Sequence, residues 1–218
     1  MKFGEITRNE EILEYYKKGN SILATLGYTD HSIAHTTMVA KNAADILEAF
    51  GYDKHDIELA KIAAFMHDIG NVINRKHHAE YGAILANEIL KEEDLSIADR
   101  VQIVSSIANH DESTGVASDP ITAALIIGDK TDVRRTRVRR KDPMMYDIHD
   151  RVNHAVTETR LECLPDEKLI VLHLTIDEES CTMYDYFEIF LGRMTMCQKA
   201  ARVLDAKFSL EVNGQRVL

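Results

Sequence analysis

The chain has 218 residues, of which 45% are hydrophobic and 28% charged, and its formal net charge is −10. This length suits one domain, or one domain with a small appendage, and the composition favours a sizeable core over disorder. The negative charge argues against general nucleic-acid binding, no apolar run approaches the roughly 20 residues that cross a bilayer, and residues 1–18 are too charged for a signal peptide.

The three cysteines, Cys163, Cys181 and Cys197, lack the paired spacing that is typical of a metal site. A small, odd number of cysteines indicates a reduced compartment and no disulfide framework. We therefore expect a cytoplasmic protein that binds neither nucleic acid nor a membrane.

Apolar residues recur with helical spacing over most of the first 160 residues. The expected helices span 9–26, 30 or 32 to 50, 53–66, 79–92, 96–109, a segment that starts near 118 or 119 and continues to about 132, and 147–162. Asp30 and Ser32 are both N-cap candidates for the second helix, and Gly51 is a stop signal for it.

The sequence pattern changes after Pro165. Residues 168–177, KLIVLHLTID, are rich in β-branched residues and alternate as a strand does. Residues 183–204 fit a long helix, and residues 206–218 predict a strand with an Asn-Gly turn. We predict a mainly α protein, with a helical domain over residues 1–162 and a small α+β tail of unassigned role over residues 163–218.

Several polar residues interrupt helix faces that are expected to be buried. The stretch AKIAAFMHDIGN, residues 60–71, ends an apolar helix with His67 and Asp68 side by side. His35, His78, His110 and Asp129 likewise lie three, four, seven or eleven residues from apolar positions of their helices. Burying a carboxylate costs several kcal/mol unless something compensates its charge.

Shared metal ions would compensate these buried groups, because a cation offsets the carboxylates and neutral imidazoles are good ligands. A single inward histidine is usually a hydrogen-bonded core residue, so the interpretation rests on the order His, His-Asp, His, His, Asp at successive helix ends. We expect one or two divalent transition-metal ions. Nitrogen and oxygen ligands suit iron or manganese, and also cobalt, nickel or zinc.

The order His35, then His67-Asp68, then Asp129 resembles the HD superfamily of metal-dependent phosphohydrolases. The additional histidines at 78 and 110 resemble its dinuclear branch. The stretches MHDIGN, HAEYGAILA and IANHDESTG are similar to those of small bacterial HD hydrolases that cleave diadenosine polyphosphates. The resemblance covers roughly residues 20–140, implies an HD-type helical bundle, and does not extend to the tail.

The resemblance also implies roles for the six residues. His35, His67, Asp68 and Asp129 would hold a first metal, and His78 with His110 would hold a second. Asp68 would bridge the two ions, and Asp68 and Asp129 are expected to be the catalytic residues. Many members have a lysine that contacts phosphate where this chain has Asn71, and Arg75 or Lys76 is expected to replace its charge.

Residues 134–141, RRTRVRRK, contain six basic residues among eight. They form either a solvated surface or a phosphate-binding segment. Arg135 resembles an arginine near the site of similar hydrolases, and a guanidinium matches phosphate oxygens well. The residues expected to bind substrate are Arg135, Arg134, Lys130, Arg75 and Asn71. His31, four residues before His35, is expected to be exposed in the first turn of its helix, and a contact to a third metal or to phosphate is the alternative.

The function that these residues favour is a metal-dependent phosphohydrolase that attacks a nucleotide or a related small phosphate ester with a metal-bound hydroxide. A di-iron oxygenase of the same fold and a non-catalytic, nucleotide-binding regulatory domain are the alternatives. The expected partner is a small phosphate-containing molecule, and pairing of an exposed strand in the tail would give a homodimer.

Overall fold

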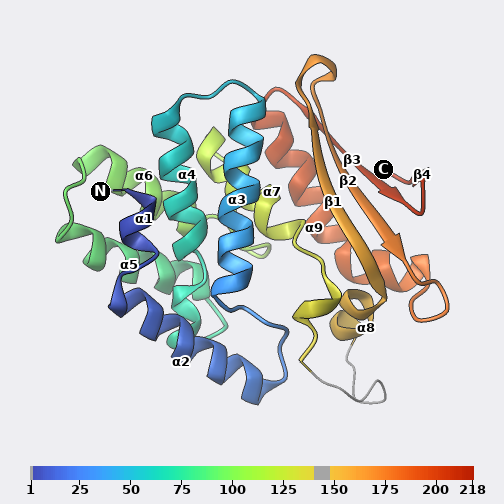
Figure 1. Ribbon diagram of the computed structural model, residues 1–218, viewed down its shortest axis with the longest axis horizontal. Helices are drawn as coiled ribbons and strands as arrows, with labels where there is room; N and C mark the ends of the chain where they lie inside the picture. Colours follow the sequence, from blue (N-terminus) through green and yellow to red (C-terminus); the bar gives the residue numbers. More distant parts are fainter. Residues whose placement is uncertain (1, 140–147) are drawn as a thin grey trace.

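The computed structural model describes residues 2–139 and 148–218. Arg140 and Lys141, at the end of the basic run, lie outside the described residues. The first part is helical: α1 (Phe3–Ile6), α2 (Glu10–Leu26), α3 (Ile33–Ala49), α4 (Lys54–Met66), η1 (Ile69–Val72), α5 (His78–Lys91), α6 (Ile97–Ala108), α7 (Pro120–Lys130), η2 (Arg135–Arg137) and α8 (Ile148–Ala155). Figure 1 shows α3, α4 and α7 side by side at the centre of this block.

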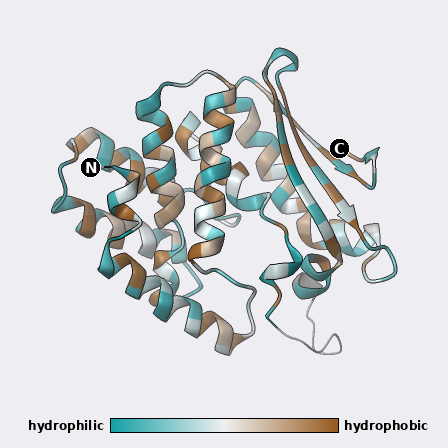
Figure 2. Ribbon diagram, viewed as in Figure 1, coloured by the Kyte–Doolittle hydropathy of each residue, from teal (hydrophilic) through white to brown (hydrophobic). Residues whose placement is uncertain are grey.

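Four of these helices begin at a capping side chain. The side chains of Asn9, Asp53, Ser96 and Asp119 accept hydrogen bonds from the free backbone N–H groups of α2, α4, α6 and α7. Helix α2 ends at Gly27, whose φ of 84° needs the left-handed conformation that glycine adopts easily. Hydrophilic and hydrophobic residues interleave along α2, as expected for a helix with one buried face (Figure 2).

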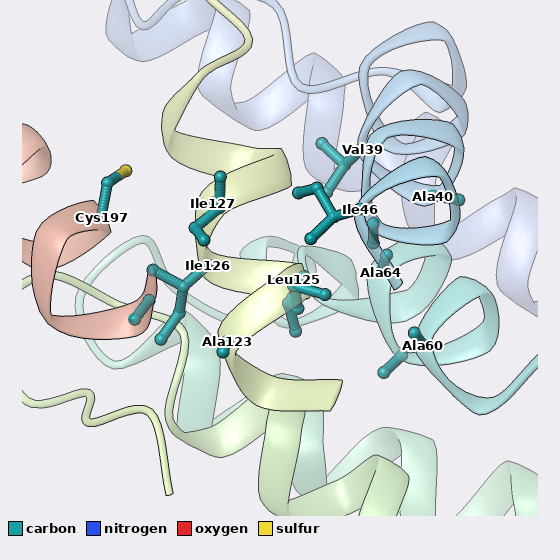
Figure 3. Packing of buried hydrophobic residues seen from close by; sticks show 14 of the residues in the cluster. Val39, Ala40, Ile46, Ala60, Ala64, Ala123, Leu125, Ile126, Ile127 and Cys197 are labelled. Atoms are coloured by element: carbon teal, nitrogen blue, oxygen red, sulfur yellow. The ribbon is translucent and has the colours of Figure 1, made fainter. Parts of the chain in front are cut away.

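The core forms where α3, α4 and α7 meet (Figure 3). Ile46 of α3, Ala60 and Ala64 of α4, and Leu125 of α7 are fully buried. Small residues allow the helices to approach: a Cβ at Gly128 of α7 would lie 3.0 Å from the Val39 carbonyl oxygen of α3. This close approach fixes α7 against α3 near the ends that carry the polar residues.

The tail is a four-stranded sheet with one long helix. Its elements are β1 (Val156–Leu164), η4 (Pro165–Glu167), β2 (Leu169–Ile176), α9 (Met183–Val203), β3 (Lys207–Val212) and β4 (Gln215–Arg216). The strand order is β1-β2-β3-β4; β2 and β3 are parallel and are joined through α9, whereas the outer pairs are antiparallel. Helix α9 lies between the sheet and α7 (Figure 1).

The predicted helix over 147–162 is wrong in its second half. Residue 147 lies outside the described residues, α8 ends at Ala155, and Val156–Leu164 form β1. The backbone of this segment pairs with β2, so that Leu161 faces Leu172 and Cys163 faces Ile170. Long-range pairing overrides the weak helical pattern there.

The mainly α fold with a small C-terminal α+β part is confirmed. A single cluster of buried residues includes Leu125 of the helical block together with Phe190 and Leu210 of the tail. None of the helices in the described ranges is long and apolar enough to cross a membrane.

Candidate metal centre

Six residues that the sequence singled out gather at the ends of five helices. His67 is the C-cap of α4 and Asp68 begins η1, while His35 and His78 lie in the first turns of α3 and α5. His110 follows α6, and Asp129 is near the end of α7. These helix ends lie close together, so that the six side chains meet in one largely buried cluster.

Glycines bring two of these ends together. A Cβ at Gly70 would lie 2.0 Å from the His78 carbonyl oxygen, and a Cβ at Gly82 would lie 3.1 Å from the His67 carbonyl oxygen. Because neither glycine has a Cβ, η1 packs directly against the start of α5. This backbone contact sets the separation between the His67-Asp68 pair and His78.

The first group of ligand atoms comes from α3, α4 and α7. His35 Nε2 lies 3.3 Å from Asp129 Oδ1 and 3.7 Å from Asp68 Oδ2. His67 Nε2 lies 3.4 Å from Asp68 Oδ2 and 3.7 Å from Asp129 Oδ1. His35, His67 and Asp129 each offer one ligand atom, and these atoms lie within 4.8 Å of one another.

The second group adjoins the first. His67, Asp68 and His110 also offer ligand atoms within 4.8 Å of one another. His78 Nε2 lies 3.1 Å from His110 Nε2 and 3.5 Å from Asp68 Oδ1. One carboxylate oxygen of Asp68 therefore faces the first group, and the other faces His78.

Each of the four histidines presents Nε2 to this cluster and uses Nδ1 elsewhere. The Nδ1 atoms of His67, His78 and His110 lie 2.6, 3.1 and 2.6 Å from the carbonyl oxygens three residues earlier. His35 Nδ1 instead lies 2.6 Å from Asp132 Oδ2. Because a carbonyl or carboxylate accepts the Nδ1 proton, Nε2 keeps its lone pair for a ligand.

Three atoms of the cluster are buried without a hydrogen-bond partner among the described residues: His35 Nε2, His67 Nε2 and Asp68 Oδ2. Separations of 3.3–3.7 Å between these groups are too long for good hydrogen bonds. They suit atoms that share an ion, since ligands about 2.1 Å from one centre lie roughly 3.0–3.5 Å apart. The residues thus fit a transition-metal ion.

The charges within the cluster also favour the binding of a cation. Burial opposes ionisation of Asp68, yet His67 and the other nearby imidazoles hold the pKa of its carboxyl well below its ordinary value. Burial likewise lowers the pKa of His67, but Asp68 and Asp129 outweigh it and raise that pKa to about 10. Burial lowers the pKa of His110 well below its ordinary value, which favours the neutral ligand form.

Asn71, Arg75 and Lys130 surround the two carboxylates. Asn71 is buried and donates through Nδ2 to Asp68 Oδ1 at 2.8 Å, while its own Oδ1 accepts from Arg75 at 3.3 Å. Lys130 donates to Asp129 Oδ2 at 2.7 Å. Arg75 and Lys130 line one cavity together with Asp68 and Asp129, the metal-site cavity. Lys76 is exposed.

The arginines at 134, 135 and 137 of the basic run have different surroundings. Arg134 forms two hydrogen bonds with Asp132, through Nε at 2.5 Å and Nη2 at 3.0 Å, and thus supports the residue that orients His35. Arg135, expected to bind substrate, is exposed and donates to the His154 carbonyl; it lines a second cavity beside Val156 instead. Among the described arginines of this run, Arg137 lines the cavity that contains Asp68 and Asp129.

His31 corrects another expectation. Helix α3 begins at Ile33, so His31 precedes the helix, and its side chain is buried against the cavity rather than exposed. The sequence interpretation also missed Glu112 and Arg193, which line the same cavity. Glu112 follows His110 closely, a signal that was available; Arg193 comes from the tail, and no local pattern links it to the site.

The fold and this cluster agree with a comparison to known families. The HD domain family model matches residues 32–152, more than half of the chain, and the chain belongs to the HD domain family. The family match and the His/Asp cluster together support a metal-dependent hydrolase in broad terms.

Two individual proteins are similar to the chain. The uncharacterized protein MJ1020 of Methanocaldococcus jannaschii is 28% identical, over 83% of this chain and 78% of the relative. A solved structure of a predicted HD superfamily hydrolase from an uncultured Thermotogales bacterium is 26% identical, with a TM-score of 0.44 over 58% of this chain and 68% of that one.

Proposed function

We propose that this chain is a metal-dependent phosphohydrolase that acts on a nucleotide or a related small phosphate ester. The observation that carries the proposal is the set of unpartnered ligand atoms on His35, His67 and Asp68, together with the cavity that Asp68 lines with Arg75, Lys130 and Arg137. Metal-ligand atoms below cationic side chains are the combination that phosphate-ester hydrolysis needs.

His35, His67, Asp68 and Asp129 would hold a first metal ion, and His78 and His110 would hold a second, with Asp68 shared. The orientation of Asp68 supports this sharing, because its Oδ2 faces His67 and its Oδ1 faces His78. When bound, such ions lower the pKa of water and stabilise charge that develops on phosphate oxygens. Iron or manganese is our preferred occupant.

The residues around the carboxylates would orient the reactants. Asn71 fixes the rotamer of Asp68 through two hydrogen bonds, to its carbonyl and its carboxylate. Arg75 contacts Asn71 from the cavity side, so its guanidinium is placed to meet a phosphate oxygen. Arg75 would therefore supply the charge of the lysine that Asn71 replaces.

A turnover assay with a panel of nucleotides and simple phosphate esters tests the function. The protein is loaded in turn with manganese, iron and cobalt, and product is measured first without oxygen and then in air. We expect phosphate or nucleotide release without oxygen, and no release by Asp68→Ala. Product formed only in air by the iron-loaded protein would identify an oxygenase. Tight nucleotide binding without turnover under any metal would identify a regulatory binding domain.

A further inference from the structure

The tail contributes one side chain to the metal-site cavity. Arg193 lies on α9, outside the matched residues 32–152, yet it lines the cavity together with Asp68 and Asp129. Helix α9 is held at this position by its contact with α7 and by four residues that lie in the common core: Tyr186, Phe190, Met194 and Cys197. Figure 3 shows Cys197 of α9 across from Ile126 and Ile127 of α7.

The Arg193 guanidinium is held in place before any ligand arrives. Its Nε donates to Glu112 Oε1 at 2.8 Å, and its Cζ lies 4.5 Å from the centre of the Phe190 ring. Among the described residues, no hydrogen bond uses its two terminal nitrogens, and the side chain is 24% exposed. Glu112 holds the Nε side of the guanidinium and the Phe190 ring covers one of its faces. The terminal nitrogens therefore remain as donors for an oxyanion.

Arg193 stands at a distance from the metal ligands. Glu112 Oε1, which accepts from Arg193, also lies 3.8 Å from Lys130 Nζ, and Lys130 contacts Asp129. Two side chains therefore separate Arg193 from the nearest carboxylate of the metal cluster. An anionic group bound at Arg193 would lie beyond a phosphate bound at the metal ions.

We propose that Arg193 binds a second anionic group of the substrate, and that the cavity therefore selects diphosphates over monophosphates. This inference rests on the proposed phosphohydrolase function. It concerns anion binding, which can be measured without turnover. It gives the tail a role, because α9 supplies a specificity residue to a site built by the helical block.

Calorimetry with two inert anions tests the inference. Methylenebisphosphonate mimics a diphosphate and resists hydrolysis, whereas inorganic phosphate has one phosphoryl group. Manganese-loaded parent protein is compared with Arg193→Ala, with Arg193→Gln, and with Arg202→Ala, an exposed arginine of the same helix that lies away from the cavity. The glutamine variant keeps most of the aliphatic part of the side chain beside Phe190. It replaces the alanine variant in the test if the alanine variant does not fold.

We expect Arg193→Ala and Arg193→Gln to bind methylenebisphosphonate about tenfold more weakly or worse, the size of one charge-assisted hydrogen bond. Their affinity for inorganic phosphate should change by no more than about twofold, and Arg202→Ala should match the parent for both anions. Equal affinity of the Arg193 variants and the parent for the bisphosphonate would overturn the proposal. So would a parent protein that binds the two anions equally well.

Kinetics separate this inference from the proposed function. If the parent hydrolyses esters, Arg193→Ala should raise KM for a nucleoside diphosphate about tenfold and leave kcat and the KM for a monophosphate within about threefold. If the parent hydrolyses none, the proposed function fails, and the calorimetric comparison still decides whether Arg193 binds the second anion.

Discussion

Asp132 accepts the Nδ1 proton of His35 over 2.6 Å, although His35 lies on α3 and Asp132 lies far along the sequence, in the loop that follows α7. Burial opposes ionisation of Asp132, but His35 and Arg137 keep the pKa of its carboxyl below its ordinary value, so it is a charged acceptor. A charged acceptor fixes the tautomer of His35 and makes Nε2 a stronger ligand.

Removal of this support should weaken metal binding. We expect Asp132→Ala to lower metal affinity about 10- to 100-fold, as is typical when the partner of a ligating histidine is lost. Competition with a chelator measures the affinity, and Asp166→Ala, which removes an exposed carboxylate far from the site, is the control. Affinities of the two variants that agree within about twofold would show that Asp132 does not support His35.

The shared role of Asp68 predicts a difference between two metal-site variants. Asp68→Ala should empty both sites, because its two oxygens face different ligand groups. His78→Ala should empty mainly the second site. Elemental analysis of the purified proteins gives the occupancy, with His55→Ala, an exposed histidine, as the reference. The bridging assignment is wrong if Asp68→Ala retains as much metal as the parent.

The contact between η1 and α5 should be intolerant of any side chain. A Cβ at Gly70 would fall 2.0 Å from the His78 carbonyl oxygen, which is backbone and cannot rotate away. Overpacking of this kind costs about 1–3 kcal/mol and often more, so Gly70→Ala should lower the free energy of unfolding by about 2 kcal/mol or more. Urea denaturation measures it. Gly4→Ala, with open space around its Cβ, should change stability by less than about 1 kcal/mol.

Two of the three arginines that the sequence offered for substrate, Arg75 and Arg135, should behave differently. Arg75 lines the metal-site cavity, whereas Arg135 lies at the second cavity and is occupied by the His154 carbonyl. Arg75→Ala should raise KM for a phosphate ester about tenfold or more, if it makes a charge-assisted bond. Arg135→Ala should leave KM within about twofold. Equal effects of the two substitutions would indicate diffuse attraction of anions instead of a local contact.

The residues proposed as ligands stand out in the sequence because each one breaks a local rule. His67 and Asp68 end an apolar helix, and His35 and Asp129 lie on buried helix faces, so helical spacing alone marks them as unusual. A buried polar group needs a partner. Several buried polar residues at successive helix ends therefore indicate one shared partner, such as a metal ion. Five of the six residues form two groups that share His67, which the spacing did not indicate, and His78 adjoins them through His110 and Asp68.

The remaining features depend on contacts that no local pattern records. The strand β1 follows α8 without a breaking residue, and its β-branched residues Val156, Thr157 and Thr159 were the overlooked signal. Arg193 enters the cavity only because α9 packs against α7, and Arg135 leaves it because η2 turns toward α8. Side-chain direction at these positions is set by tertiary packing, which sequence spacing does not encode.

The close packing of Gly128 against α3 has a consequence for the order in which the protein matures. Ribosomes produce His35, His67, Asp68, His78 and His110 before α7, and α7 carries Asp129 and leads directly to Asp132. During synthesis, His35 therefore lacks its neighbour Asp129 and its orienting partner Asp132 until α7 has emerged and docked. The proposed set of ligands is complete only in the folded helical block, so we expect tight binding of a metal ion to be a late event in biogenesis.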